Sequence, residues 1–262
     1  MDLQIEVLPL VRSVLDFFWN NFPAFSLTGW LFPLSVLWSF GSLYAAGYCK
    51  RQWNWKTGYT RKLFHFLIFF TAFLYQRKFG LPGVFILGWA VTLLLSYAIF
   101  KGNGNILYEA LAREKDAPHE TKYIIYSYLA TFFGGVLSNL LFGPFAVFGY
   151  AVTGIADAVA EPIGTRFGRH HYRVFSIDKH KKSFRSLEGS MAVFISVLAI
   201  IYLSPCLYFL PLSNYLWIAI VCTLVEALSP SGFDNMLLQL VASLLFHHLL
   251  YNSVGYAECL GI

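Results

Sequence analysis

Charge is scarce in this chain. Only 13% of its 262 residues are Asp, Glu, Lys or Arg, whereas 57% are hydrophobic and the mean hydropathy is +0.58. Soluble domains carry about 25% charged residues, so a surface that is wholly exposed to water is excluded. Several apolar runs approach the roughly 20 residues that a helix needs to span a bilayer. The composition therefore predicts an all-α, polytopic integral membrane protein.

Motifs of several other classes are also absent. The four cysteines form no CxxC pair and no metal-binding spacing, so we expect buried thiols that behave as small hydrophobes. Neither a P-loop nor the glycine-loop and catalytic-loop motifs of protein kinases occur. Asp2 and Glu6 stand where a signal or transit peptide needs positive charge, so no cleaved leader is expected. The net charge of +5 comes from basic residues in loops between apolar runs, and we expect no nucleic-acid partner.

Apolar periodicity divides the chain into helices. Residues 1–22 place apolar side chains at helical spacing with charged ones between them, which predicts an amphipathic helix at the membrane interface. Residues 23–262 are expected to form a single membrane-embedded domain with about seven or eight transmembrane helices. The predicted spans are 24–48, 63–79, 81–100, 123–142, 143–163, 189–210, 213–229 and 235–255.

Basic residues distinguish the two sides of this domain. Alternating spans place the loops 50–62, 101–122 and 164–187 on one side, and these loops hold five, four and seven of the 19 Lys and Arg residues. The positive-inside rule makes that side cytosolic. We therefore expect a multi-pass protein whose active site faces the cytosol.

Two carboxylates lie inside the predicted span 143–163. Asp157 and Glu161 are four residues apart, so they share one helix face near its cytosolic end. Each costs a few kcal/mol at depth in a membrane unless it is compensated. One explanation is structural, an ion pair with Arg61, Lys62 or Arg166. The other is functional, because Mg²⁺ is commonly held by one or two carboxylates together with phosphate oxygens.

A loop rich in basic, hydroxyl and glycine residues follows. Such a composition suits polyphosphate, through charge and through N–H donors at a helix start. The alternative is a basic loop resting on anionic lipid headgroups. The residues of interest are Gly164, Arg166, Lys182, Ser183, Arg185, Ser186, Glu188 and Gly189.

Two further polar groups lie beside predicted spans. The start of the second span holds Arg61, Lys62 and His65. Snorkelling basic side chains are the alternative explanation there. The break between the last two spans holds Glu226, Asp234 and Asn235. Asp234 could simply cap the last helix. The predicted topology puts all these groups on the cytosolic side, which favours one membrane-embedded site with acids for a metal, cations for phosphate and apolar walls for a lipid.

The ordered set of motifs resembles the polyprenol kinase family, which includes dolichol kinase, phytol kinases and the CTP-dependent diacylglycerol kinase of yeast. The resemblance covers residues 60–236. Its segments are Arg61-Lys-Leu-Phe-His65, Asp157 with Gly164-x-Arg-Phe-Gly168, Lys182-Ser-x-x-Ser-Leu-Glu-Gly-Ser190, and Glu226-Ala-Leu with Asp234-Asn235. The chain departs from the family pattern at Ala156, where Gly is usual, and at Glu161-Pro162, where small apolar residues are common.

The resemblance implies transfer of the γ-phosphate of a nucleotide, CTP or alternatively ATP, to the hydroxyl of a membrane lipid. Phytol, dolichol, a farnesol-type alcohol and diacylglycerol all fit that description. We expect catalytic roles for Asp157, Glu161 and Glu226, and Mg²⁺ bound by Asp157, Glu161 or Glu188. Nucleotide phosphates are expected to contact Arg61, Lys62, Arg166, Lys182, Ser183, Arg185, Ser186, Glu188 and Gly189. Further site residues are His65, Gly164, Asp234 and Asn235.

Two other classes stay open at this point. A phosphatidate cytidylyltransferase would make CDP-diacylglycerol and release pyrophosphate rather than a nucleoside diphosphate. A cation- or proton-coupled transporter would use the intramembrane acids to carry its ions. The sequence does not predict the oligomeric state.

Overall fold

A computed structural model describes residues 3–175, 183–204, 207, 210–230 and 232–251. Helices make up most of this part of the chain, as predicted. A short antiparallel pair of strands, which the sequence analysis did not predict, joins α7 to α8. The elements are α1 (Leu3–Asn20), α2 (Phe25–Trp53), α3 (Thr57–Lys101), α4 (Ile106–Glu109), η1 (Glu114–Asp116), α5 (Glu120–Phe142), η2 (Gly143–Phe145), α6 (Ala146–Val152), η3 (Thr153–Asp157), α7 (Ala158–Phe167), β1 (His171–Val174), β2 (Ser183–Ser186), α8 (Leu187–Tyr202), α9 (Leu212–Leu228) and α10 (Asp234–Leu250).

The main helices lie where the apolar periodicity predicts them. The predicted number of membrane spans, seven or eight, is not confirmed. By length and composition, two helical stretches can cross a membrane, Thr57–Lys101 and Glu120–Phe167. The count is three if α2 and the bent α1 before it form one span. The 16 or 17 residues of α8, α9 and α10 extend only about 24–26 Å, less than the roughly 30 Å of a hydrocarbon core.

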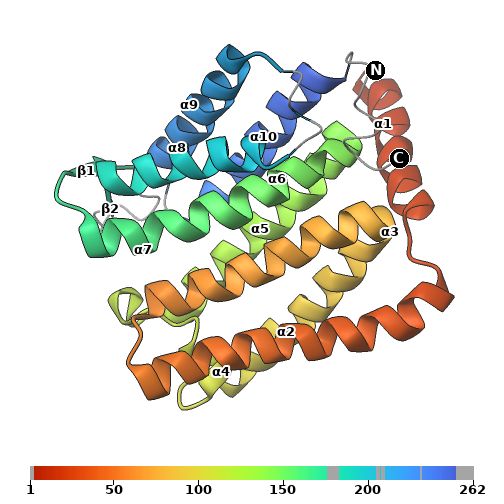
Figure 1. Ribbon diagram of the computed structural model, residues 1–262. Helices are drawn as coiled ribbons and strands as arrows, with labels where there is room; N and C mark the ends of the chain where they lie inside the picture. Colours follow the sequence, from red (N-terminus) through yellow and green to blue (C-terminus); the bar gives the residue numbers. More distant parts are fainter. Residues whose placement is uncertain (1–2, 176–182, 205–206, 208–209, 231, 252–262) are drawn as a thin grey trace.

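Both long stretches contain breaks, which is why the helix count and the span count differ. Gly80 has φ 65°, a left-handed conformation that other residues rarely adopt, and α3 turns back on itself there (Figure 1). The second stretch breaks at Gly143, with φ 56°, where α5 gives way to η2 and α6. The sequence placed its span boundaries at 79–81 and 142–143, so both turns agree with the prediction.

Helix α1 lies across the bundle rather than along it (Figure 1). Val11–Asn20 meets α2 at 79°. Val11, Leu15 and Trp19 expose between 48% and 83% of their surface. This orientation and the exposed apolar side chains fit the predicted interfacial helix.

Two hydrophobic clusters form the core, and α6 lies between them. One contains Leu43, Leu87 and Tyr150 with their neighbours from α2, α3, α4 and α5. The other contains Phe148 and Phe246 and is built by α6 to α10. Successive residues of α6 therefore supply both cores, and the site described below lies where the two helical groups meet at one end.

The three basic loops gather at that same end. The ends of α2 and α4, the start of α3 and the strands β1 and β2 all lie on the left of Figure 1. Lys50 bonds to Glu114 at 2.7 Å, which joins the first loop to the second. The structure thus agrees with the grouping of positive charge on one side, with residues 176–182 of the third loop outside the described part.

Close packing of α6 against α10 depends on Gly149. A Cβ there would lie 2.7 Å from the backbone oxygen of Gln239 and would also collide with Ser243. We expect Gly149→Ala to lower the free energy of unfolding by about 1–3 kcal/mol through overpacking. Gly88→Ala is the matched control, because nothing lies within 4 Å of its Cβ position. Unfolding in detergent, followed by circular dichroism, measures both, and equal stability of the two variants would contradict this packing.

Candidate active site

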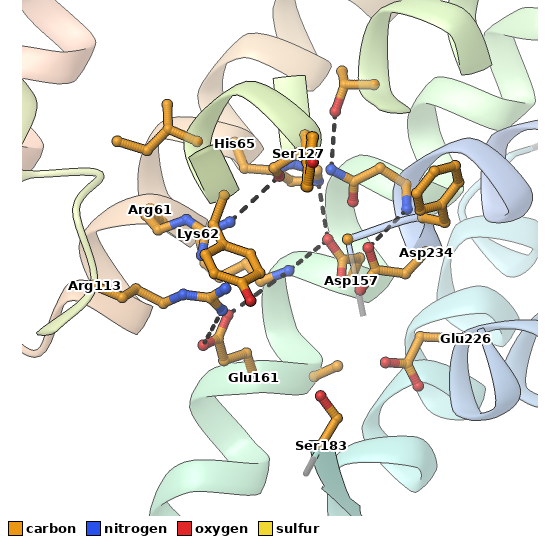
Figure 2. Close-up of a pocket in the computed structure, with 18 of the residues that line it drawn as sticks. Arg61, Lys62, His65, Arg113, Ser127, Asp157, Glu161, Ser183, Glu226 and Asp234 are labelled. Atoms are coloured by element: carbon orange, nitrogen blue, oxygen red, sulfur yellow. Dashed lines mark hydrogen bonds and ion pairs between the residues drawn. The ribbon is translucent and has the colours of Figure 1, made fainter. Parts of the chain in front are cut away.

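A cavity of about 1150 Å³ opens at the end of the bundle where the basic loops meet (Figure 2). Side chains from α3, α5, α7, β2, α9 and α10 line it. Thirteen of the sixteen residues predicted from sequence are among them, although they lie far apart in the chain. These are Arg61, Lys62, His65, Asp157, Glu161, Gly164, Ser183, Arg185, Ser186, Gly189, Glu226, Asp234 and Asn235.

The other three predicted residues lie elsewhere. Arg166 is exposed, with its guanidinium 5.4 Å from the centre of the Phe167 ring. Glu188 does not line the cavity, and its carboxylate contacts Nδ1 of His170 at 2.8 Å. Lys182 lies outside the described residues. The structure therefore leaves Asp157 and Glu161 as the cavity-lining members of the predicted metal-binding set.

An ion pair between α3 and the end of η3 dominates the cavity wall. Lys62 Nζ lies 2.6 Å from Asp157 Oδ2, and their side chains are 13% and 3% exposed. An ion pair with Arg61, Lys62 or Arg166 was the structural explanation for a buried Asp157, and the partner is Lys62. Arg61 instead donates to Ser127 Oγ at 3.3 Å.

Asp157 ends a five-residue π-helix, which is a departure from regular helix often found at functional sites. His65 reaches the same region from α3. Its Nε2 lies 3.4 Å from Asp157 Oδ2 and 3.1 Å from the carbonyl oxygen of Thr153. The hydroxyl oxygen of Thr153 is buried and has no hydrogen-bond partner among the described residues. The π-helix thus places one carboxylate beside a lysine and a histidine.

Glu161 lies one turn further along and connects to a loop that carries no family motif. Arg113 Nη1 is 3.8 Å from Glu161 Oε1, and Arg113 Nε donates to Asp116 at 2.7 Å (Figure 2). Lys62 Nζ is 4.0 Å from Glu161 Oε2. Sequence reasoning counted Arg113 only among the basic residues of the loop 101–122. It could not predict that this loop folds over the cavity.

Arg185 on β2 is the second centre of charge. Its guanidinium contacts the carboxylate of Glu226 and lies 3.2 Å from Asp234 Oδ2. Burial opposes the charge of Arg185, but these two carboxylates raise the pKa of the guanidinium above its usual value. The group therefore keeps its positive charge at every physiological pH. The strand pair, missed from sequence, is what directs Arg185 into the cavity.

The turn before α8 is held by its own residues. Ser186 caps the helix by accepting a hydrogen bond from the Gly189 N–H at 3.1 Å. Gly164 of α7 packs against the same hydroxyl, because a Cβ there would lie 2.9 Å from Ser186 Oγ. These three predicted site residues thus bring α7 and α8 into close contact beside the cavity.

On the opposite wall, α10 contacts α5. Asn235 donates from Nδ2 to Thr131 Oγ1 at 2.9 Å, and its Oδ1 is buried without a hydrogen-bond partner in the part of the chain that the structure describes. A buried amide oxygen of this kind is a ready acceptor for a ligand or a water. Thr131 and Ser127 both line the cavity, and neither belongs to a motif detectable in the sequence.

Magnesium fits this cavity only together with a substrate. Across the described residues, no three His, Cys, Asp or Glu side chains are grouped to hold a metal ion. Mg²⁺ needs fewer protein ligands, because it is usually bound by one or two carboxylates plus waters and phosphate oxygens. Asp157 and Glu161 supply two carboxylates in one cavity wall. The residues present therefore fit a nucleotide-bound Mg²⁺ rather than a closed metal site.

Comparisons of the chain with protein-family models, with curated proteins and with solved structures found no match. The chemistry of the cavity therefore has to be inferred from its own residues.

The contacts of Arg185 predict a large structural role for that residue. Arg185→Met leaves the buried carboxylate of Glu226 without its cation, and removal of one partner of a buried ion pair costs about 3–5 kcal/mol. Arg166→Met is the matched control, because that arginine is exposed, its guanidinium lies over the neighbouring Phe167 ring, and the loss of such a surface group changes stability by less than about 0.5 kcal/mol. Unfolding of both variants in detergent tests the difference. A near-native Arg185→Met would show that Glu226 is compensated in another way.

Proposed function

We propose that the chain is a membrane enzyme that transfers a phosphoryl group from a nucleotide, CTP in the first instance, to the hydroxyl of a lipid alcohol. The observation that carries the proposal is the cavity itself. It combines the carboxylates of Asp157, Glu161, Glu226 and Asp234 with five cations, which are Arg61, Lys62, Arg113, Lys122 and Arg185. Apolar side chains line the remainder of the same cavity, so a charged and an apolar substrate can meet there.

The membrane topology of the proposal follows the predicted one. We infer eight crossings by α2, the two halves of α3, α5, the α6–α7 stretch, α8, α9 and α10. The cavity then lies at the cytosolic ends of these helices, because the basic loops mark that side. A water-soluble nucleotide reaches it from the cytosol, and a lipid reaches it without leaving the bilayer.

Cations suit the nucleotide part of the reaction. Phosphoryl transfer proceeds through a loose transition state in which positioning and charge stabilisation supply most of the catalysis. Arg61 and Arg113 both line the cavity and would contact phosphate oxygens. When bound, Mg²⁺ would neutralise charge on the nucleotide phosphates, with Asp157 and Glu161 as its protein ligands.

In the transfer step, the lipid hydroxyl oxygen forms a bond to the γ-phosphorus. The bond from that phosphorus to the bridging oxygen breaks, and the nucleoside diphosphate leaves with the bond's electron pair. The alcohol proton passes to a carboxylate, for which we assign Glu226, one of the two cavity acids, with Asp234, that the metal does not need. Lys62 and His65 hold Asp157 in position beside it.

The direct test is incubation of the purified protein in detergent with Mg²⁺, γ-labelled CTP or ATP, and a panel of lipid alcohols. We expect label in an organic-extractable lipid phosphate and release of a nucleoside diphosphate. Pyrophosphate released with phosphatidate as the acceptor would instead establish a cytidylyltransferase. Absence of both products, with ion flux in sealed vesicles, would establish a transporter.

Asp157→Asn tests the site. The substitution removes one metal ligand while keeping the size of the side chain, so we expect turnover per folded molecule to fall by at least about a hundredfold, even though loss of the Lys62 ion pair also lowers stability. Asp16→Asn is the matched control, because Asp16 is exposed on α1 and far from the cavity lining. Transfer rate and thermal unfolding are measured on both. Loss of folded protein equal to the loss of turnover would assign Asp157 to the Lys62 ion pair alone.

A further inference from the structure

The cavity continues past its charged part into an apolar arm. The arm is bordered by the two halves of α3, by α5, and by the segment around Leu111 that follows α4. Its residues are Phe64, Ile68, Phe69, Val91, Leu95, Leu111, Ile124 and Tyr128. Most of these residues are 8% exposed or less, so this part of the cavity lies inside the protein. Its apolar side chains offer no hydrogen bonds or charges to a nucleotide and suit a hydrocarbon instead.

Helix geometry gives the depth of the arm. Val91 lies ten residues before Lys101, the last residue of α3, which is about 15 Å along the helix axis. Phe69 lies eight residues after Arg61, or about 12 Å. Half of a hydrocarbon core is about 15 Å. The arm therefore extends from the charged residues to about the level of the bilayer midplane.

The arm also reaches the outside of the protein next to α5. Tyr126 lines the cavity and yet exposes 43% of its surface. Two residues further on, the Tyr128 hydroxyl shares a hydrogen bond of 2.5 Å with Thr92 Oγ1 of α3, which joins the two helices that border the arm.

We propose that this arm binds the hydrocarbon chain of the lipid alcohol, with the hydroxyl in the charged part of the cavity and the chain running towards the bilayer midplane between α3 and α5. The inference rests on the proposed function for the identity of the headgroup. It adds the location of the chain and the residues that limit its length. Val91 and Leu95 line the arm from the second half of α3. Their side chains limit the length of hydrocarbon chain that the arm accepts.

The first experiment measures binding without phosphoryl transfer. The purified protein is irradiated with a long-chain isoprenoid alcohol that carries a diazirine near the end of its tail, and the labelled peptides are identified by mass spectrometry. We expect label on residues 81–101 and 120–142, suppressed by excess unlabelled alcohol. Label confined to the outer faces of α2 or α9, or label that excess alcohol does not suppress, would overturn the proposal.

The second experiment uses Leu95→Trp, which fills the arm with a larger ring. Leu93→Trp is the matched control, since Leu93 is on the same helix, is 55% exposed and does not line the cavity. Each pair of methylenes excluded from the arm lowers affinity by about tenfold. Leu95→Trp is thus expected to weaken binding of a long alcohol at least about tenfold relative to a short one, as measured by competition against the photolabel. An equal effect on both lengths would overturn the proposal.

Failure of the arm and failure of the proposed function give different results. Specific label on α3 and α5 without phosphoryl transfer from any nucleotide would support the chain-binding arm and contradict the proposed kinase activity. Phosphoryl transfer to a lipid alcohol, with no change in chain-length preference in Leu95→Trp, would support the kinase activity and contradict the chain-binding arm.

Discussion

Pairing of charge in a low-dielectric interior is the constraint on which this structure depends. An unpaired carboxylate or ammonium group costs several kcal/mol when it is buried, and attraction compensates that cost only with good geometry. Lys62 and Asp157 satisfy this condition between α3 and the end of η3, and Arg185 satisfies it for Glu226 and Asp234. The first ion pair joins the first and middle thirds of the chain, and the second centre joins β2, α9 and α10 of the last third. The same groups then give the cavity its alternating charge.

The interior of the protein is otherwise held by close contacts between small residues and by caps. Gly149 allows α6 to approach α10, and Gly164 allows α7 to approach the Ser186 turn. Ser186 ends the strand pair and begins α8 with a single side-chain hydrogen bond. These contacts fix the directions of α7, β2 and α8 relative to one another. They therefore determine where Arg185 and Asp157 lie, although none of them involves charge.

The sequence predicted the helices well because apolar runs and left-handed glycines mark their limits. Gly80 and Gly143 both coincide with predicted boundaries. Motif residues such as Arg61 and Glu226 were also predicted to share one site, because topology placed them on one side of the membrane. Arg113 and Ser127 could not be predicted, since only the fold of the loop 101–122 and the rotation of α5 bring them to the cavity. The strand pair was missed because four-residue strands leave no clear periodicity.

The pairing of Lys62 with Asp157 also bears on how the protein is made. The two residues are 95 positions apart, so Lys62 is synthesised well before its partner. Until Asp157 and the rest of η3 pack against α3, this ion pair cannot form. A chain that stops before Asp157 therefore lacks the carboxylate that pairs with Lys62 near the start of α3, so the first long helix of the site is completed only by a residue made much later.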